Sequence, residues 1–335
     1  MRVGIAGYGV VGKKRYSSII KNTSFKVTDI SEVNPTARDE IPDGVNVFNN
    51  YQDLILKADL DIIFISLPNK YASDAVSLSL KKGLNVFCEK PPARTLEELL
   101  DVQKIYKKNP HVKLMYGFNH RFHLSVEEAK TIIDSKNYGK VINLKGVYGK
   151  SQMIDFNQTD WRTKREESGG GILLDQGIHM LDLMRYFCGD FAEIKSFVSN
   201  YYWKHKVEDN AYIIMRSNKK IVAMLHSTAT QWQHQFRIEI TLEKALIYLT
   251  GILSGSMTYG EEKIEIQPKL SKNKKATKRS FNKDLSWERE ISEYIDCIKF
   301  NKKIYNGTIF ESIKVMKMID TIYKSDNEWK EKYLG

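Results

Sequence analysis

A glycine-rich turn near the start of the chain constrains the fold most. An apolar run is followed at once by Gly7-Tyr8-Gly9-Val10-Val11-Gly12, and the next stretch has helical character. A second short apolar stretch, FKVTDIS, contains Asp29, which lies 17 residues past Gly12 and is interpreted as its terminal acid. Strand, glycine turn, helix, strand and acid in this order are typical of a dinucleotide-binding unit.

Each part of this pattern has a physical role. Gly7 permits the tight turn, Gly9 lets the backbone approach a pyrophosphate, and Gly12 lets the helix lie close to the strand. The helix N-terminus then offers N–H groups to the phosphates. A carboxylate at Asp29 accepts from the adenosine ribose hydroxyls and repels a 2′-phosphate, so NAD is favoured over NADP. The basic residues 13–15 are close enough to leave NADP open.

Two other interpretations of the turn are less favoured. A secretory signal would need a small-residue cleavage site, and the basic residues 13–15 interrupt the apolar run too early. A kinase glycine loop would be followed by VAIK-like and HRD-like segments, which are absent from the sequence.

Length and composition set outer limits. A chain of 335 residues is long enough for two domains with their own cores. It has no run of 18 apolar residues, so we expect no membrane span. Its three cysteines are far apart, which suits a reducing compartment and a cytoplasmic protein. They offer no metal-ligand spacing and the seven histidines form no HExxH cluster, so we predict no metal site.

The net charge of +11 raises the question of nucleic-acid binding. Seven positive charges fall in residues 268–283, which are interpreted as a solvated loop between a strand and a helix. Only Phe281 interrupts this run with an aromatic ring, so we expect no nucleic-acid partner. Attraction of small anions is the favoured consequence.

The secondary-structure pattern changes near residue 120. Before it, apolar strands alternate with helices, which predicts an α/β Rossmann domain with a doubly wound parallel sheet over residues 1–120. After about residue 191, successive strands alternate with period two, which predicts an α+β domain with an open, mostly antiparallel sheet over residues 121–335. Closing helices at about 286–300 and 308–325 are expected to pack back towards the first domain.

Chemistry in a doubly wound fold belongs at the carboxyl ends of the strands. Three predicted strands end in Leu67-Pro68-Asn69, in Glu89-Lys90 and in the segment from Asn119 to Arg121. Lys90 precedes two prolines that fix the backbone, and there it would face the nicotinamide. The alternative for Lys90 is a surface ion pair with Glu89.

A second chemical segment spans residues 167–190. Gly169-Gly170-Gly171 removes side chains where a ligand or cofactor would need close approach. Asp175 and His179 are four residues apart, which predicts one face of a helix. A carboxylate beside an imidazole suits a proton acceptor working near neutral pH. The alternatives are that Asp175 is only an N-cap and that His179 is structural.

These motifs together resemble the GFO/IDH/MocA oxidoreductases. The resemblance runs from residue 1 to about 325 and rests on AGYGVVG, VTDIS, DIIFISLPN, CEKPPARTLEE, YGFNHRF, DWR, GGGILLDQGIHMLDL and the closing TIFESIKVMKMIDTIYKS. It implies that Lys90 contacts the nicotinamide and the substrate hydroxyl, and that His179 of the DxGxH pattern, with Asp175, is the general base or acid. It also implies a set of cofactor and substrate positions that includes Asn119, Arg121, Trp161 and Arg162.

Two departures from the family pattern stand out. Ala72 occupies the position of the histidine in the usual PNxxH, so we expect a local change near the cofactor. Leu242 and Ala245 replace the glycines of a turn beside the sheet that the family uses for dimerisation. A homodimer or homotetramer remains the expectation.

The expected function is an NAD-dependent oxidoreductase that moves a hydride between a ring CH–OH of a sugar and nicotinamide. Arg121, Arg162 and Arg165 favour a nucleotide sugar. A ketoreductase of a keto-sugar nucleotide, an inositol or free-sugar dehydrogenase, and a non-catalytic NAD-sensing regulator remain open. The predicted cofactor-binding positions are Gly7, Tyr8, Gly9, Val10, Val11, Gly12, Asp29, Leu67, Pro68, Asn69, Glu89, Lys90 and Asn119.

Overall fold

The structure is a computed structural model that describes residues 1–22, 24–151, 161–254, 257–269 and 275–333. The chain forms two compact units, which are described separately. The first contains residues 1–119 and 287–313, and the second contains residues 120–286 and 314–335. Residues 287–313 therefore group with the N-terminal residues, whereas the sequence analysis assigns them to the second domain as helices packing towards the first.

The first unit is built on a parallel sheet, with strand order β3-β2-β1-β4-β5-β6. This is the classic doubly wound order, which reverses direction between β1 and β4. The predicted Rossmann architecture is confirmed. The strands are β1 (Arg2–Ala6), β2 (Lys26–Ser31), β3 (Asn46–Phe48), β4 (Ile62–Ile65), β5 (Asn85–Glu89) and β6 (Leu114–Gly117).

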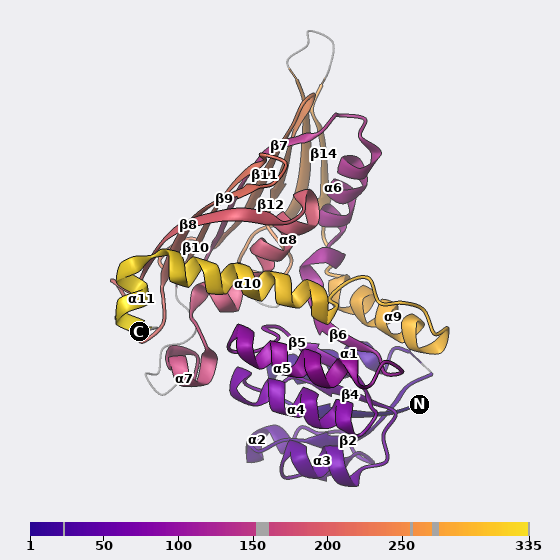
Figure 1. Cartoon of the computed structure of the whole chain (residues 1–335). Helices are drawn as coiled ribbons and strands as arrows, with labels where there is room; N and C mark the ends of the chain where they lie inside the picture. The colour runs from indigo at the N-terminus through magenta and orange to yellow at the C-terminus, as the bar shows by residue number, and fades with distance from the viewer. Residues whose placement is uncertain (23, 152–160, 255–256, 270–274, 334–335) are drawn as a thin grey trace. The chain divides into compact units, whose positions relative to one another are not determined.

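Helices connect these strands as the alternating pattern predicts. Helices α3, α4 and α5 lie in a row in Figure 1, and α4 packs against both of its neighbours. The helices of this part are α1 (Val10–Ile19), α2 (Pro35–Arg38), α3 (Tyr51–Lys57), α4 (Asn69–Lys81) and α5 (Leu96–Lys107). Near the C-terminus, α9 (Ser286–Lys299) joins the first unit from Trp287 onward, and α10 (Ile309–Ser325) begins in it.

The second unit contains a mixed sheet with strand order β14-β13-β12-β11-β7-β10-β9-β8. All of its neighbouring pairs are antiparallel except β7 with β10, so the predicted open, mostly antiparallel sheet is confirmed (Figure 1). The strands are β7 (Val141–Gly149), β8 (Phe191–Ser199), β9 (Asn210–Ser217), β10 (Val222–Thr228), β11 (Gln235–Leu242), β12 (Ala245–Thr250), β13 (Glu262–Pro268) and β14 (Thr277–Phe281).

The interpretation of residues 268–283 as a loop is wrong for its second half. Thr277–Phe281 forms edge strand β14, which pairs with β13 from Glu262↔Phe281 to Ile266↔Thr277. Its side chains are mostly exposed, and Lys278 and Arg279 pair with Glu265 and Glu128. The basic charges thus lie on a sheet edge, where charged residues discourage pairing with another chain. Residues 270–274 lie outside the described part of the chain.

Several helices of the second unit pack against this sheet. The 3₁₀ helix η1 (Asn119–Phe122) leads into α6 (Leu124–Ser135), and α8 (Ile178–Cys188) packs on β7 and β10. A π-helical turn, η3 (Leu173–Gly177), runs directly into α8. The remaining helices are η2 (Trp161–Thr163), α7 (Arg165–Ser168) and α11 (Asn327–Tyr333). Among the described residues, no helix is long and apolar enough to cross a membrane.

Candidate functional site

The glycine-rich turn has the geometry that a pyrophosphate needs. Gly7 has φ +90°, and a Cβ on Gly12 would lie 2.0 Å from the Gly7 carbonyl oxygen. A Cβ on Gly9 would meet no atom within 4 Å. Gly9 is the N-cap of α1 and provides no side-chain cap. The positive φ of Gly7 and the close contact at Gly12 explain why turn and helix need glycine, and the open space at Gly9 leaves the helix N-terminus accessible to an anion.

The acid at the end of β2 is Glu32, not Asp29. Strand β2 continues to Ser31, so Asp29 lies inside it, where its carboxylate accepts from the Asn46 side chain at 3.0 Å. Glu32 follows the strand and accepts the Tyr8 backbone N–H at 2.6 Å. It therefore lies beside the glycine turn, where the ribose of a dinucleotide is expected.

A helix-start signal in the sequence points to Glu32 rather than Asp29 as the acid at the end of β2. Asn34 caps α2 by accepting from the Thr36 N–H, and Pro35 is the first helical residue. A cap followed by proline marks a helix start, so β2 has to end just before Asn34. Glu32 is the acid that immediately precedes this helix start.

The segment Leu67-Pro68-Asn69 follows β4, as the sequence predicts. Asn69 begins α4 directly after Pro68, and Leu67 and Pro68 are half-buried. Ala72 is 3% exposed within α4. Asn119 follows β6 and is also buried.

Strand β5 ends at Glu89, and half-buried Lys90 follows it in a turn with a cis Lys90–Pro91 bond. The Glu89 carboxylate accepts from the Arg15 Nε at 2.5 Å. The predicted alternative for Lys90 is a surface ion pair with Glu89. In the structure the buried Arg15 already binds this carboxylate, so Lys90 would have to compete with Arg15 for it.

The glycine triplet of the second unit serves packing. Gly169 ends α7 with φ +84°. A Cβ on Gly170 would lie 2.2 Å from the Tyr323 hydroxyl, and one on Gly171 would lie 2.1 Å from the Glu208 carbonyl oxygen. The protein's own atoms fill the space that the sequence analysis assigns to a ligand.

Asp175 lies in a π-helical turn that runs directly into α8, so the predicted helix is present, but the four residues from Asp175 to His179 do not follow regular α-helical geometry. The Lys150 ammonium lies 3.5 Å from its Oδ2, and the Gln176 amide donates to the same oxygen at 3.3 Å. Burial raises the pKa of Tyr148 and of Tyr259, and the negative charge of Asp175 raises both further. Asp175 therefore sits among a cation and two tyrosines that stay protonated at neutral pH. A π-bulge of this kind is frequent at functional sites.

His179 lies in the first turn of α8 and is 3% exposed. The His120 ring stacks on it, with centroids 3.7 Å apart and planes 13° apart. His120 also lies 3.2 Å from the Tyr148 hydroxyl through its Nε2. This stack restricts the orientation of the His179 ring, and the sequence analysis did not anticipate it because His120 and His179 come from distant segments.

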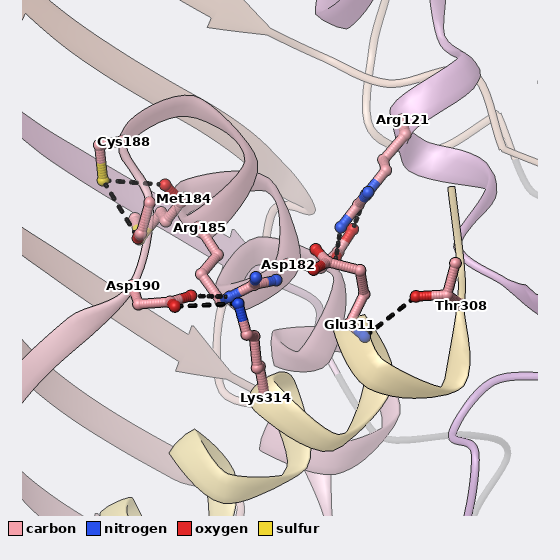
Figure 2. A network of polar contacts seen from close by, with 10 residues as sticks. Arg121, Asp182, Met184, Arg185, Cys188, Asp190, Thr308, Glu311 and Lys314 are labelled. Carbon is pink, nitrogen blue, oxygen red and sulfur yellow. Dashed lines mark hydrogen bonds and ion pairs between the residues drawn. The ribbon is translucent and has the colours of Figure 1, made fainter. Parts of the chain in front are cut away.

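The predicted substrate arginine Arg121 is buried and paired. Its Nε and Nη2 donate to the two carboxylate oxygens of Asp182 at 2.7 and 2.6 Å, as Figure 2 shows. Arg165 packs over Tyr323, with its Cζ 5.1 Å from the ring centroid. In η2, the Arg162 Cζ lies 4.3 Å from the ring centroid of the adjacent Trp161. Asp160 of the DWR motif lies outside the described residues.

The described residues contain no group of three or more His, Cys, Asp or Glu side chains that could hold a metal ion. For the dinucleotide, the open cradle at Gly9 and the carboxylate of Glu32 provide a fitting phosphate and ribose site within the first unit. The side chains suited to proton transfer, Asp175 and His179, belong to the second unit.

Profile comparisons identify the family. The profile described as "Oxidoreductase family, NAD-binding Rossmann fold" matches residues 1–118, and that of the GFO/IDH/MocA C-terminal domain matches residues 126–248. The chain belongs to the GFO/IDH/MocA family of oxidoreductases, and its N-terminal domain is of the NAD-binding type. The resemblance stated from the sequence motifs is confirmed.

Curated relatives include sugar and inositol dehydrogenases. Levoglucosan dehydrogenase of Pseudarthrobacter phenanthrenivorans is 27% identical over 60% of this chain and 54% of its own length. D-glucoside 3-dehydrogenase of Escherichia coli is 29% identical over 58% of this chain and 56% of its own. The chain thus matches about half the length of these two relatives.

Solved structures share the fold over nearly the whole chain. Levoglucosan dehydrogenase in complex with NADH and levoglucosan has a TM-score of 0.85 at 19% identity and covers 98% of both chains. The WlbA dehydrogenase from Bordetella pertussis, in complex with NADH and UDP-GlcNAcA, has a TM-score of 0.82 at 17% identity and covers 98% of this chain and 97% of its own.

Proposed function

We propose that this chain is an NAD-dependent dehydrogenase that moves a hydride between a ring CH–OH of a sugar or cyclic polyol and nicotinamide. The observation that carries the proposal is the retention of His179, buried and stacked on His120, in a chain whose N-terminal domain is of the NAD-binding type. A sensor of NAD would need the cradle but not an oriented imidazole and the lysine after β5.

The residues divide the work as follows. The backbone around Gly9 and the α1 N-terminus bind the pyrophosphate, and Glu32 accepts from the ribose hydroxyls. When bound, NAD accepts the hydride that leaves the substrate carbon. His179 takes the hydroxyl proton in oxidation and returns it in reduction. Lys90 orients the substrate oxygen, and Asp175 supplies negative charge that favours a proton on the base.

The substrate assignment favours a free sugar, glycoside or inositol. The sequence analysis favours a nucleotide sugar because of three arginines, but Arg121 is neutralised by Asp182. Arg165 lies beside the buried Glu208 carboxyl, whose pKa burial raises and this arginine lowers. Of the three arginines, only Arg162 still supports a nucleotide-sugar substrate. A nucleotide sugar remains the second candidate because Arg162 lies in the half-buried turn of η2.

Reduced-nicotinamide absorbance tests the proposal directly. Wild type is assayed with NAD and NADP against levoglucosan, glucosides, inositols and UDP-sugars, after the denatured protein has been checked for carried-over cofactor. We expect NAD reduction with one group of free sugars or polyols, and its loss in His179→Asn. Turnover of UDP-sugars alone would select the second candidate. NAD binding without turnover in either direction would favour a sensor.

A homodimer or homotetramer is part of the proposal for the whole protein. Leu242 is the last residue of β11 and Ala245 the first residue of β12, and both side chains are buried. Light scattering of the purified chain distinguishes a monomer from the expected oligomers.

A further inference from the structure

A buried ionic cluster adjoins the turn that carries Lys90. Arg15 of α1 is 1% exposed, and its Nε donates to the Oε1 of Glu89 at 2.5 Å. Its Nη2 lies 2.7 Å from the Oε2 of Glu290, a fully buried residue of α9. One guanidinium thus joins α9 to the strand residue that immediately precedes Lys90.

Aromatic rings fix the same guanidinium. The Arg15 Cζ lies 4.5 Å from the ring centroid of Phe87 and 4.3 Å from that of Trp287. Phe87 and Glu89 are two residues apart on β5, so their side chains leave the same face of the strand. Strand β5 therefore holds Arg15 by both stacking and charge, which the planar fork of arginine allows and the ammonium of lysine does not.

A glycine on the neighbouring strand makes room for this pair. Gly117 of β6 lies opposite Glu89 in the sheet register. A Cβ on Gly117 would lie 3.0 Å from the Arg15 Nη2 and 3.2 Å from the Glu89 Oε2. Any side chain at this position would push the ion pair by a few tenths of an ångström.

Stability alone is a weak reason for such a cluster. Removing two or three charges from water costs several kcal/mol per ion, and apolar residues of similar volume often stabilise a fold as well or better. A buried ionic cluster is better suited to fixing one arrangement of the elements that it joins. Here one of the joined elements is β5, whose last residue, Glu89, directly precedes Lys90.

We propose that Arg15 is a positioning residue that acts through Glu89 to hold the turn carrying Lys90, and that Glu290 and Gly117 keep Arg15 in place. This inference rests on the proposed role of Lys90. Because Glu89 and Lys90 are adjacent, a displacement of the Glu89 carboxylate also shifts the lysine. A misplacement of about 1 Å at a reacting centre can cost about 100-fold in rate.

The protonation of Glu290 gives the cluster a pH signature. Burial raises the pKa of Glu290 to about 8; Arg15 of α1 opposes this rise, while Glu89 of β5 and Glu293 of α9 add to it. Below this pH, Glu290 holds a proton and Arg15 is balanced by Glu89. Above it, a second carboxylate competes for the guanidinium, so the hold on Glu89 weakens.

Steady-state kinetics of four variants test the proposal. We expect Arg15→Met to lower kcat about tenfold or more, Arg15→Lys less, and Gly117→Ala in the same direction, with KM for NAD within about threefold of wild type. The control is Leu54→Ala, a fully buried position on α3 that should cost about 2–5 kcal/mol of stability and leave kcat within about twofold. Arg15 variants that keep wild-type kcat would overturn the proposal.

The pH profile separates positioning from general support of the fold. Wild-type kcat should decline as the pH rises through about 8, and Glu290→Gln should keep its kcat there because its side chain cannot ionise. Superimposable profiles for the two proteins would contradict the role of Glu290 in holding Arg15.

A labelling experiment works even if no sugar is turned over. Acetic anhydride is reacted with each folded protein, and the acylation rate of Lys90 is read by mass spectrometry. Arg15→Lys and Gly117→Ala should change this rate at least about threefold, while Leu54→Ala should not. A changed rate without turnover in any protein would leave the positioning proposal standing and reject the proposed function. An unchanged rate in both variants would reject the positioning proposal, whatever the activity.

Discussion

Both units contain a glycine cluster, but the two clusters exist for different reasons. Around Gly9 the added Cβ would meet open space, and the adjoining α1 N-terminus has no side-chain cap. Around Gly170 and Gly171 it would strike Tyr323 and the Glu208 backbone. At Gly9 the first cluster leaves room for a ligand, whereas at Gly170 and Gly171 the second lets the protein pack against itself. A glycine-rich motif therefore has to be judged by what lies where its side chain would be.

The charged side chains show the same contrast. Lys90, in the first unit, is half-buried at the end of β5, and the carboxylate before it is bound by Arg15. Arg121, in the second unit, is buried and bound bidentately by Asp182. Bidentate pairing uses the guanidinium as a structural cross-link. Arg121 therefore serves the packing of its unit, whereas Lys90 follows a strand end, where the functional side chains of a doubly wound fold gather.

The largest effect is expected for Lys90→Met. Because the methionine keeps the length of the side chain and removes its charge, turnover should fall by about 1,000-fold or more while NAD binding stays within about twofold. Substrate assays and NADH fluorescence titration measure the two quantities. Lys104→Met, at an exposed position of α5, is the control and should change neither. Equal loss of binding and turnover in Lys90→Met would show that Lys90 is structural.

The glycine comparison is tested by a pair of alanine variants. Gly171→Ala should destabilise the protein by about 3 kcal/mol, because its Cβ meets a backbone oxygen that cannot move aside easily. Gly9→Ala should cost about 1 kcal/mol or less and raise KM for NAD about tenfold. Thermal unfolding and NAD kinetics measure both. The comparison fails if Gly9→Ala unfolds the protein or Gly171→Ala weakens NAD binding without lowering Tm.

The sequence predicts the first unit better than the second unit's site because its signals are local. Strand, turn and helix around Gly7 to Gly12 are set by neighbouring residues, and so are the strand end at Glu89 and the helix from Asn69. The π-turn at Asp175 and the stack of His120 on His179 depend on residues far apart in the sequence. No periodicity within one segment reports such contacts.

Strand β14 and Glu32 were missed for different reasons. Thr277–Phe281 contains the adjacent cations Lys278 and Arg279 and is mostly exposed, and only pairing with β13 makes it a strand. Asp29 was chosen instead of Glu32 because the predicted strand stopped at Asp29, whereas β2 continues to Ser31, shortly before the helix cap at Asn34. The first error reflects tertiary context overriding local propensity, and the second could have been avoided from the sequence.

A smaller effect distinguishes the two acids of the β2 region. Glu32→Gln should raise KM for NAD about tenfold and improve the use of NADP, because a carboxylate that repels the 2′-phosphate is lost. Asp29→Asn should change KM for NAD by less than about threefold, because Asp29 binds Asn46 inside the strand. Steady-state assays with both cofactors provide the comparison. The reverse order of effects would restore Asp29 as the ribose acid.

The smallest effect concerns the buried acids, one in each unit. Burial raises the pKa of Glu290 from the usual 4.5 to about 8, and burial also raises the pKa of Glu208. A folded state that holds a proton more tightly than the unfolded chain is stabilised fully below about pH 4.5 and loses that stabilisation up to about pH 8. Glu290→Gln removes this loss, so its stability relative to wild type should increase as the pH rises from 5 to 9. Denaturant unfolding across this pH range measures the difference.

Glu208→Gln is the matched variant in the second unit. The Oε1 of Glu208 accepts from both the Leu173 N–H and the Tyr323 hydroxyl, and a glutamine oxygen can accept both, but glutamine loses the attraction of the carboxylate for Arg165. Glu208→Gln should therefore gain less stability than Glu290→Gln as the pH rises. If the two variants gain equally, the two acids are equivalent and the contrast between the units does not extend to their cores.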